Sequence, residues 1–95
     1  MARSILQDEK CCFFCGTCNS LEEHHIFGGH ANRKISEREG FKVYLCHRHH
    51  NEPPSGVHFN AEYSNALKRR CQEEYEKTHT RADFIRLIGK NYRED

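Results

Sequence analysis

The sequence predicts a small α+β fold in which a short antiparallel pair of strands is followed by helices. Apolar and polar residues alternate over 41–45, as they do in a strand, and apolar residues over 63–75 recur at helical spacing. Five of the six Cys and seven of the eight His lie within 11–58. We therefore expect one domain over 1–95, with a Cys- and His-rich core at 11–58 and helices at 60–90.

The first half of the chain is expected to contain a tight turn and two strands. Cys12-Phe-Phe-Cys15-Gly16 is typical of a tight turn, and residues 21–27 follow as the first strand. Gly28-Gly29 interrupts this strand, and a 13-residue connection from Gly28 to Gly40 leads to a half-buried second strand. Two strands with this connection predict an open antiparallel hairpin, followed by a loop over 51–56.

The second half predicts two helices. Asn60 is a suitable N-cap for the first, and Thr80 with Asp83 resembles a capping box for the second, which Gly89 would end. The expected buried faces are Tyr63, Ala66, Leu67, Cys71 and Tyr75 on the first helix, and Phe84, Ile85 and Ile88 on the second. Because Cys71 lies on an apolar stripe, we interpret it as a buried free thiol and not as a ligand.

The composition indicates a core too lean to stabilise the fold alone. Only 36% of the residues are hydrophobic, and even with glycine counted this falls below the usual share of about 45–50%. No apolar run exceeds five residues, so no membrane span is expected. Residues 1–10 show no signal-peptide pattern, so we expect a cytoplasmic protein with reduced cysteines that serve as metal ligands.

The spacing of four Cys and His residues predicts a structural zinc site. The second ligand pair is Cys46 and His49, directly after a strand and separated from Cys15 by 30 residues. The first pair is either Cys12 with Cys15 or Cys15 with Cys18, because both have two residues between them. Gly16 favours Cys12 with Cys15, since such a turn needs flexible backbone after its second ligand. Reduced thiols without metal are the alternative.

Further histidines remain outside this site. His24 and His25 are adjacent on one strand and should point to opposite faces, so that one can bind a cation while the other reaches a water molecule. His50 directly follows His49, so zinc would fix its position. Net charge is only +1, but residues 31–50 carry five basic and two acidic residues. This basic segment suits a phosphate-handling site, or is simply a solvated surface.

Together these motifs resemble the HNH family, the ββα-metal (His-Me finger) endonucleases. The resemblance rests on Cys12-x2-Cys15-Gly16, on Leu21-Glu22-Glu23-His24-His25-Ile26 and on Val43-Tyr44-Leu45-Cys46-x2-His49-His50, in the family order. The run from His24 to Lys34 and Gly56-Val57-His58-Phe59-Asn60 are similar to small phage and prophage members. The resemblance implies a zinc-stapled ββα-metal finger, in a bacterial or phage-infected cell.

The resemblance also implies roles for single residues. His25 matches the general base, and His24 and His50 match ligands of a catalytic divalent cation (Mg²⁺, Mn²⁺, Ni²⁺ or Zn²⁺). His58 is a third ligand if the loop containing Pro53 and Pro54 folds back, and otherwise a cap or phosphate contact. The family's middle Asn is absent near Gly40 and Phe41, and Asn32 is the nearest candidate. Cys12, Cys15, Cys46 and His49 match the structural zinc ligands.

The chemistry of these residues fits hydrolysis of DNA phosphodiester bonds. A neutral His can deprotonate water near pH 7, and a cation with open positions can neutralise charge on the phosphate. Arg33 and Lys34, expected on the loop between the strands, either contact the DNA backbone or solvate the loop. The rival hypotheses are a zinc module that binds nucleic acid without cutting it and a small interaction protein. The sequence indicates no oligomeric state.

Overall fold

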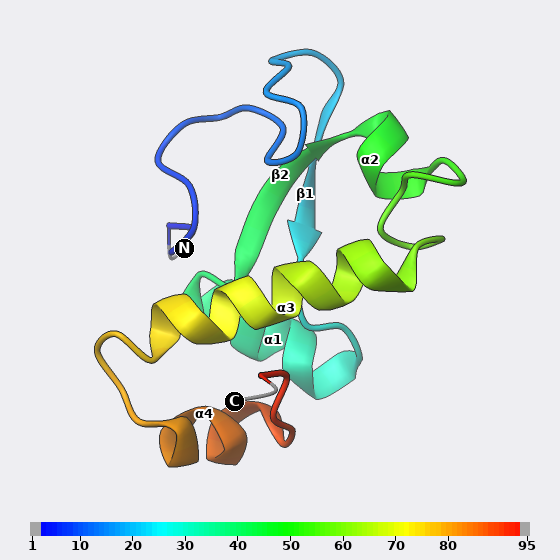
Figure 1. Cartoon of the computed structure of the whole chain (residues 1–95). Helices are drawn as coiled ribbons and strands as arrows, with labels where there is room; N and C mark the ends of the chain where they lie inside the picture. The colour runs from blue at the N-terminus through cyan, green and yellow to red at the C-terminus, as the bar shows by residue number, and fades with distance from the viewer. Residues whose placement is uncertain (1–2, 94–95) are drawn as a thin grey trace.

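The computed structural model describes residues 3–93 and consists of a two-stranded sheet and four helices. In chain order these are β1 (Leu21–His25), α1 (His30–Glu39), β2 (Lys42–Cys46), α2 (His47–Asn51), α3 (Ala61–Tyr75) and α4 (Arg81–Ile88). In Figure 1, α2 follows directly from the end of β2, and α3 runs across the direction of the hairpin. The predicted α+β class, with a hairpin followed by helices, is confirmed.

The register of the hairpin separates the two adjacent histidines. β1 and β2 are antiparallel, with His24 opposite Val43 and His25 opposite Lys42. Because successive side chains of a strand alternate between faces, Glu22 and His24 share one face of the sheet. Glu23 and His25 share the other. The side chains of the two adjacent histidines therefore lie on opposite faces of the sheet, as the sequence predicts.

An N-terminal segment covers the outer edge of β2. The side chain of Gln7 accepts a hydrogen bond from the backbone N–H of Tyr44 at 2.8 Å, and the N–H of Phe13 donates to the Tyr44 carbonyl at 2.9 Å. The Ile5 N–H donates to the Gly40 carbonyl at 3.0 Å. These bonds satisfy backbone groups that an edge strand otherwise leaves unpaired. They also bring the Cys12–Cys15 turn to the end of β2.

The connection between the strands is a helix, α1, and not the loop that the sequence predicts. Its buried side is made by Ser36, with Ile35 partly buried, so it has no long apolar stripe to reveal it. The Ser36 hydroxyl donates to the Phe27 carbonyl at 3.0 Å and accepts from the Phe27 N–H at 3.2 Å. Gly40 ends α1 at φ 78°, where a side chain would meet the Arg3 carbonyl.

The aromatic core joins the two halves of the chain. Phe27 and Phe41 contact each other with ring centroids 5.7 Å apart, and Phe84 of α4 lies 5.6 Å from Phe27. Both predicted caps are present: Asn60 accepts from the Tyr63 N–H, and Thr80 and Asp83 form a capping box. Leu67, Cys71, Phe84 and Ile88 are buried as expected.

Several side chains differ from the predicted burial, and Ala66 and Tyr75 are only partly buried. Tyr63 and Ile85 are 41% and 38% exposed, because each lies at the margin of its helix's apolar face. Lys42 was expected on the solvent side of a half-buried strand and is instead only 6% exposed. Its ammonium pairs with the carboxylates of Glu23 and Glu37, which compensates for the burial of its charge.

Candidate metal centres

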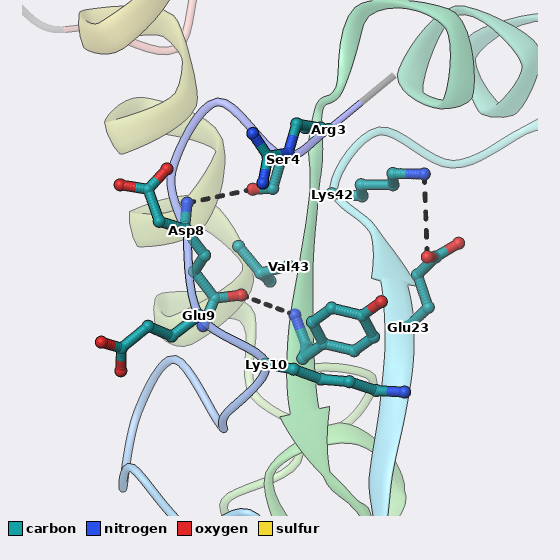
Figure 2. Close-up of a pocket in the computed structure, with 10 residues that line it drawn as sticks. Arg3, Ser4, Asp8, Glu9, Lys10, Glu23, Lys42 and Val43 are labelled. Carbon is teal, nitrogen blue, oxygen red and sulfur yellow. Dashed lines mark hydrogen bonds and ion pairs between the residues drawn. The ribbon is translucent and has the colours of Figure 1, made fainter. Parts of the chain in front are cut away.

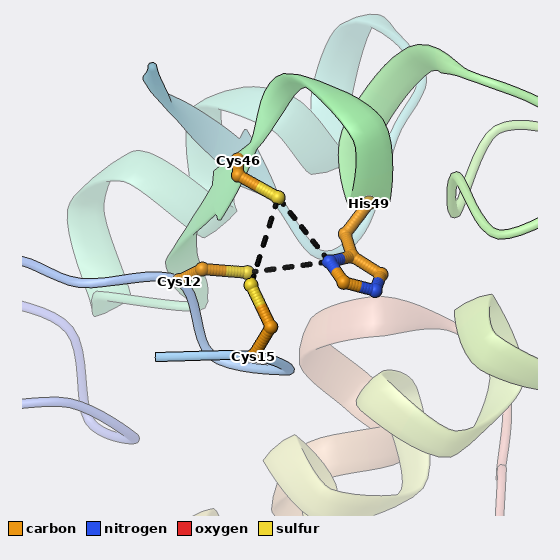
Figure 3. A group of neighbouring side chains, drawn as sticks. All are labelled: Cys12, Cys15, Cys46 and His49. Atoms are coloured by element: carbon orange, nitrogen blue, oxygen red, sulfur yellow. Dashed lines mark hydrogen bonds between the residues drawn. The ribbon is translucent and has the colours of Figure 1, made fainter. Parts of the chain in front are cut away.

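Four Cys and His side chains converge at the end of β2. Cys12 and Cys15 come from the N-terminal turn, Cys46 ends β2, and His49 lies on α2 (Figure 3). Their ligand atoms all lie within 4.8 Å of one another. The Cys46 Sγ is 3.2 Å from the His49 Nδ1, and the Cys15 and Cys46 sulfurs are 3.8 Å apart. Three sulfurs and one imidazole nitrogen at this spacing are a donor set compatible with a structural zinc ion.

The local backbone explains why Cys12 and not Cys18 belongs to this group. Gly16 has φ 79°, and its N–H donates to the Cys12 carbonyl at 2.8 Å, which closes the turn. The Cys12 N–H donates to the Thr17 carbonyl at 2.8 Å. Cys18 follows this turn as an exposed residue outside the cluster. Of the two pairs that the spacing allows, the fold assembles Cys12 with Cys15.

The surroundings of the sulfurs favour a thiolate at Cys12. Burial alone would raise the pKa of Cys12, but hydrogen bonds with backbone groups of Cys46, Cys15 and Phe14 outweigh it and lower the pKa to about 6. Burial raises the pKa of Cys46, and the neighbouring Cys12 and Cys15 add to this effect. A thiolate is the form that ligates a metal, so Cys12 is prepared for ligation, whereas Cys46 would lose its proton on metal binding.

A second cluster contains three histidines from three parts of the chain. His24 comes from β1, His50 from α2 and His58 from the segment before α3, and one ring nitrogen of each lies within 4.8 Å of the others. The Nε2 atoms of His50 and His58 are 3.1 Å apart. The ring centroid of His24 lies 5.1 Å from the ring centroid of His50 and 5.3 Å from that of His58. The three rings thus turn ring nitrogens toward a common point.

His58 reaches this cluster because the segment after α2 turns back. The Val57 N–H donates to the His49 carbonyl at 2.8 Å, and the His58 N–H donates to the His50 carbonyl at 3.4 Å. Pro53 and Pro54 follow the end of α2, but these backbone bonds keep the chain beside the helix. Asn60 then caps α3 and donates through its side chain to the Pro54 carbonyl at 3.2 Å. The sequence does not decide whether this loop folds back toward α2. In the structure it does.

The Glu22 carboxylate contacts the ring nitrogen of His50 that does not face His58. One Glu22 oxygen lies 2.7 Å from the His50 Nδ1, and the other lies 2.9 Å from the Nδ1 of His47. Asn51 donates to the same carboxylate at 2.8 Å. Hydrogen bonds from His47 and then His50 lower the pKa of Glu22 to about 2. A carboxylate on one ring nitrogen leaves the other free for a metal, as in many histidine-ligated sites.

Two histidines of this cluster, His24 and His58, disfavour protonation. Burial, followed by the proximity of His50 and His58, lowers the pKa of His24 to about 3. Burial and the neighbouring His50 also lower the pKa of His58. Neutral imidazole is the form that binds a metal. His24 and His58 therefore present metal-binding nitrogens at neutral pH.

His25 lies on the opposite face of β1, against α1. Its Nε2 is 2.8 Å from a Glu37 oxygen, and its side chain is 18% exposed. His25 lines a hollow of about 610 Å³ together with Gly29, His30, Arg33, Lys34 and Glu37. Arg33 and Lys34 are exposed on α1, so their predicted position on a loop is wrong.

Asn32 does not contact His25. Its side-chain amide donates to the Ile88 carbonyl of α4 at 3.5 Å, which holds α1 against α4. The partner of His25 is Glu37, which the sequence analysis missed together with Glu22. The period of two along β1 could have identified Glu22, since it places that residue on the His24 face. Nothing comparable indicates Glu37, because its helix was not predicted.

Another hollow, of about 340 Å³, lies between the N-terminal segment and the hairpin (Figure 2). Its wall includes Lys42 and Glu23, whose charged groups face each other at 3.7 Å. Lys10 lies over the ring of Tyr44, with its Nζ 5.4 Å from the centroid. None of the residues of the two Cys/His clusters lines this hollow.

Comparison of the chain with models of known protein families, with curated proteins and with solved structures finds no match. The arrangement itself, an antiparallel pair of strands followed by a helix with a Cys/His cluster, is compatible with a ββα-metal finger. None of the helices within residues 3–93 combines the length and apolar character needed to cross a bilayer.

Proposed function

We propose that the protein is a metal-dependent HNH-type endonuclease that hydrolyses phosphodiester bonds in DNA. The observation that carries this proposal is the assembly of His24, His50 and His58 beside the Cys12, Cys15, Cys46 and His49 cluster. His25 is the immediate neighbour of His24 on β1 and faces the hollow beside Arg33. A cation site on one face of β1, and a histidine with basic side chains on the other face, are the kinds of group that phosphodiester hydrolysis requires.

The histidine cluster fits a catalytic divalent cation. His24, His50 and His58 would hold it through ring nitrogens, and when bound it supplies positive charge to a phosphate oxygen and to the leaving 3′ oxygen. Three imidazoles favour Ni²⁺ or Zn²⁺ over Mg²⁺, which prefers oxygen ligands. The Glu22 carboxylate behind His50 supports the same interpretation, because it orients that ring for ligation.

His25 is assigned the role of general base. Glu37 occupies its Nε2, so the free Nδ1 lone pair would accept the proton of the attacking water. Arg33 and Lys34 border the same hollow and would hold the phosphate backbone of the bound DNA. Attack of water on phosphorus with loss of the 3′ oxygen leaves 5′-phosphate and 3′-hydroxyl ends.

Conversion of supercoiled plasmid in the presence of Mg²⁺, Mn²⁺, Ni²⁺ or Zn²⁺ tests the proposal. His25→Ala should lower the cleavage rate by about 10²–10⁴-fold, the usual contribution of a positioned general base. It should leave zinc content and DNA affinity unchanged. His79→Ala is the matched control, since His79 is exposed beyond α3 and stacks on Tyr75 at 4.0 Å.

His50→Ala should abolish cleavage by weakening the cation site, with partial recovery at high metal concentration. Binding of DNA by the wild-type protein without cleavage under any of these ions would contradict the nuclease proposal. That result would instead favour the zinc module that binds nucleic acid without cutting it.

A further inference from the structure

His25, Glu37 and Lys42 form a chain of three hydrogen-bonded side chains. The His25 Nε2 lies 2.8 Å from one oxygen of Glu37, and the Lys42 Nζ lies 3.1 Å from the other. Glu37 comes from the last part of α1, whereas His25 and Lys42 are opposite each other in the hairpin register. The three residues therefore meet only because α1 packs against the strand end. Within residues 3–93 no other carboxylate lies as close to His25.

Lys42 places a buried ammonium between the carboxylates of Glu23 and Glu37. Its side chain is only 7% exposed, and its ammonium also lies 3.7 Å from Glu23. Figure 2 shows the Lys42 ammonium facing the Glu23 carboxylate across the hairpin. The oxygens of Glu23 and Glu37 lie close enough to the His25 nitrogen to suggest a cation site. The ammonium already supplies the positive charge there, so the carboxylates act as hydrogen-bond partners instead.

We propose that Glu37 is the positioning residue of His25, holding its imidazole in the tautomer that carries the proton on Nε2 and leaves Nδ1 free. An ionised carboxylate can only accept hydrogen bonds, so the nitrogen beside it must be the protonated one. Lys42 fixes the second oxygen of Glu37 and thereby the direction of the first. The catalytic part of this proposal rests on the proposed function, since a free Nδ1 matters for a base.

In this arrangement Glu37, and not an Asn side chain, orients the imidazole of His25. Asn32 is the one Asn of α1, and its amide is bonded to the Ile88 carbonyl. The neighbouring Ser36 anchors α1 to the strand end through both backbone groups of Phe27. The Glu37 side chain is 34% exposed and takes no part in that anchor. Replacing Glu37 should therefore disturb His25 without unfolding α1.

The experiment compares Glu37→Ala with Glu39→Ala. Glu39 lies in the same helix, has a side chain 30% exposed and pairs with Arg38 at 3.0 Å, so it matches Glu37 in type and exposure. Two-bond ¹H–¹⁵N spectra of histidine-labelled, zinc-loaded protein in mildly alkaline solution report the imidazole tautomers. The His25 signal is assigned from its absence in His25→Ala. Cleavage of a duplex oligonucleotide supplies kcat and KM.

The wild-type protein and Glu39→Ala should show His25 with the proton on Nε2, and Glu37→Ala should show a mixture of both tautomers. Glu37→Ala should lower kcat by about tenfold to a hundredfold, as loss of an orienting partner commonly does, with KM and zinc content unchanged. Glu37→Gln, whose amide oxygen can still accept from Nε2, should recover part of kcat.

Two results would overturn the proposal. One is a wild-type His25 that carries its proton on Nδ1, and the other is an unchanged tautomer and kcat in Glu37→Ala. The tautomer measurement does not depend on cleavage. If the spectra follow the expectation while no ion supports cleavage, the coupling of Glu37 to His25 stands and the nuclease proposal fails.

Discussion

Replacing Glu22 with alanine tests whether the cluster of His24, His50 and His58 binds a metal ion. Glu22 lies 2.7 Å from the Nδ1 of His50, and no other carboxylate in residues 3–93 contacts that ring. Loss of an orienting carboxylate typically lowers metal affinity by about 10- to 100-fold, which corresponds to about 1.4–2.7 kcal/mol. Glu22 has a pKa of about 2, so the carboxylate is charged throughout the neutral pH range and the full effect should appear.

Titration calorimetry of zinc-loaded protein with Ni²⁺ measures this change. Glu23→Ala is the control, because Glu23 neighbours Glu22 in sequence but belongs to the opposite face of β1, near Lys42. We expect weaker Ni²⁺ binding in Glu22→Ala and wild-type affinity in Glu23→Ala, with zinc content equal in all three proteins. Equal Ni²⁺ affinity in the wild-type protein and Glu22→Ala would refute the inference that Glu22 orients a metal ligand.

Two further predictions concern the zinc content of the protein and its stability against unfolding. Elemental analysis should find one zinc per chain in the wild-type protein and in Cys18→Ser but not in Cys12→Ser, because Cys12 belongs to the cluster and Cys18 does not; zinc retained by Cys12→Ser would contradict the assigned ligands. Burial alone would raise the pKa of Glu76, but hydrogen bonds from Gln72 and Arg81 outweigh it, so the pKa lies below its ordinary value of 4.5. A lowered carboxyl pKa stabilises the fold above that ordinary value, and the contribution is lost as pH falls through the folded-state pKa. Thermal unfolding should therefore show Glu76→Gln less stable than wild type near neutral pH, with the difference shrinking in acid; a difference independent of pH would exclude this origin.

Local spacing predicts the Cys/His cluster once Gly16 is used to choose Cys12 over Cys18. Cys12 with Cys15, and Cys46 with His49, each lie within a single turn, where two intervening residues fix the direction of both side chains. The separation of His24 from His25 likewise follows from the alternation of side chains along a strand. What the sequence could not decide was the path of residues 52–58, because backbone bonds to α2 determine it.

The partners of the histidines were not predictable, because they depend on tertiary packing. Glu37 contacts His25 only through α1, and α1 rests on a buried Ser36 and not on an apolar stripe. Lys42 looked like a solvent-facing residue in an alternating strand, yet two carboxylates surround its ammonium. Hydrophobic periodicity reports only apolar burial, so it does not reveal a buried network of charges.

The adjacency of His49 and His50 on α2 links the two clusters. His49 belongs to the cysteine-rich cluster and His50 to the histidine cluster, so zinc bound at His49 would hold the helix turn that also carries His50. Filling of the histidine cluster should then follow zinc uptake and never precede it. Protein stripped by a chelator is expected to regain a second ion only after zinc is restored.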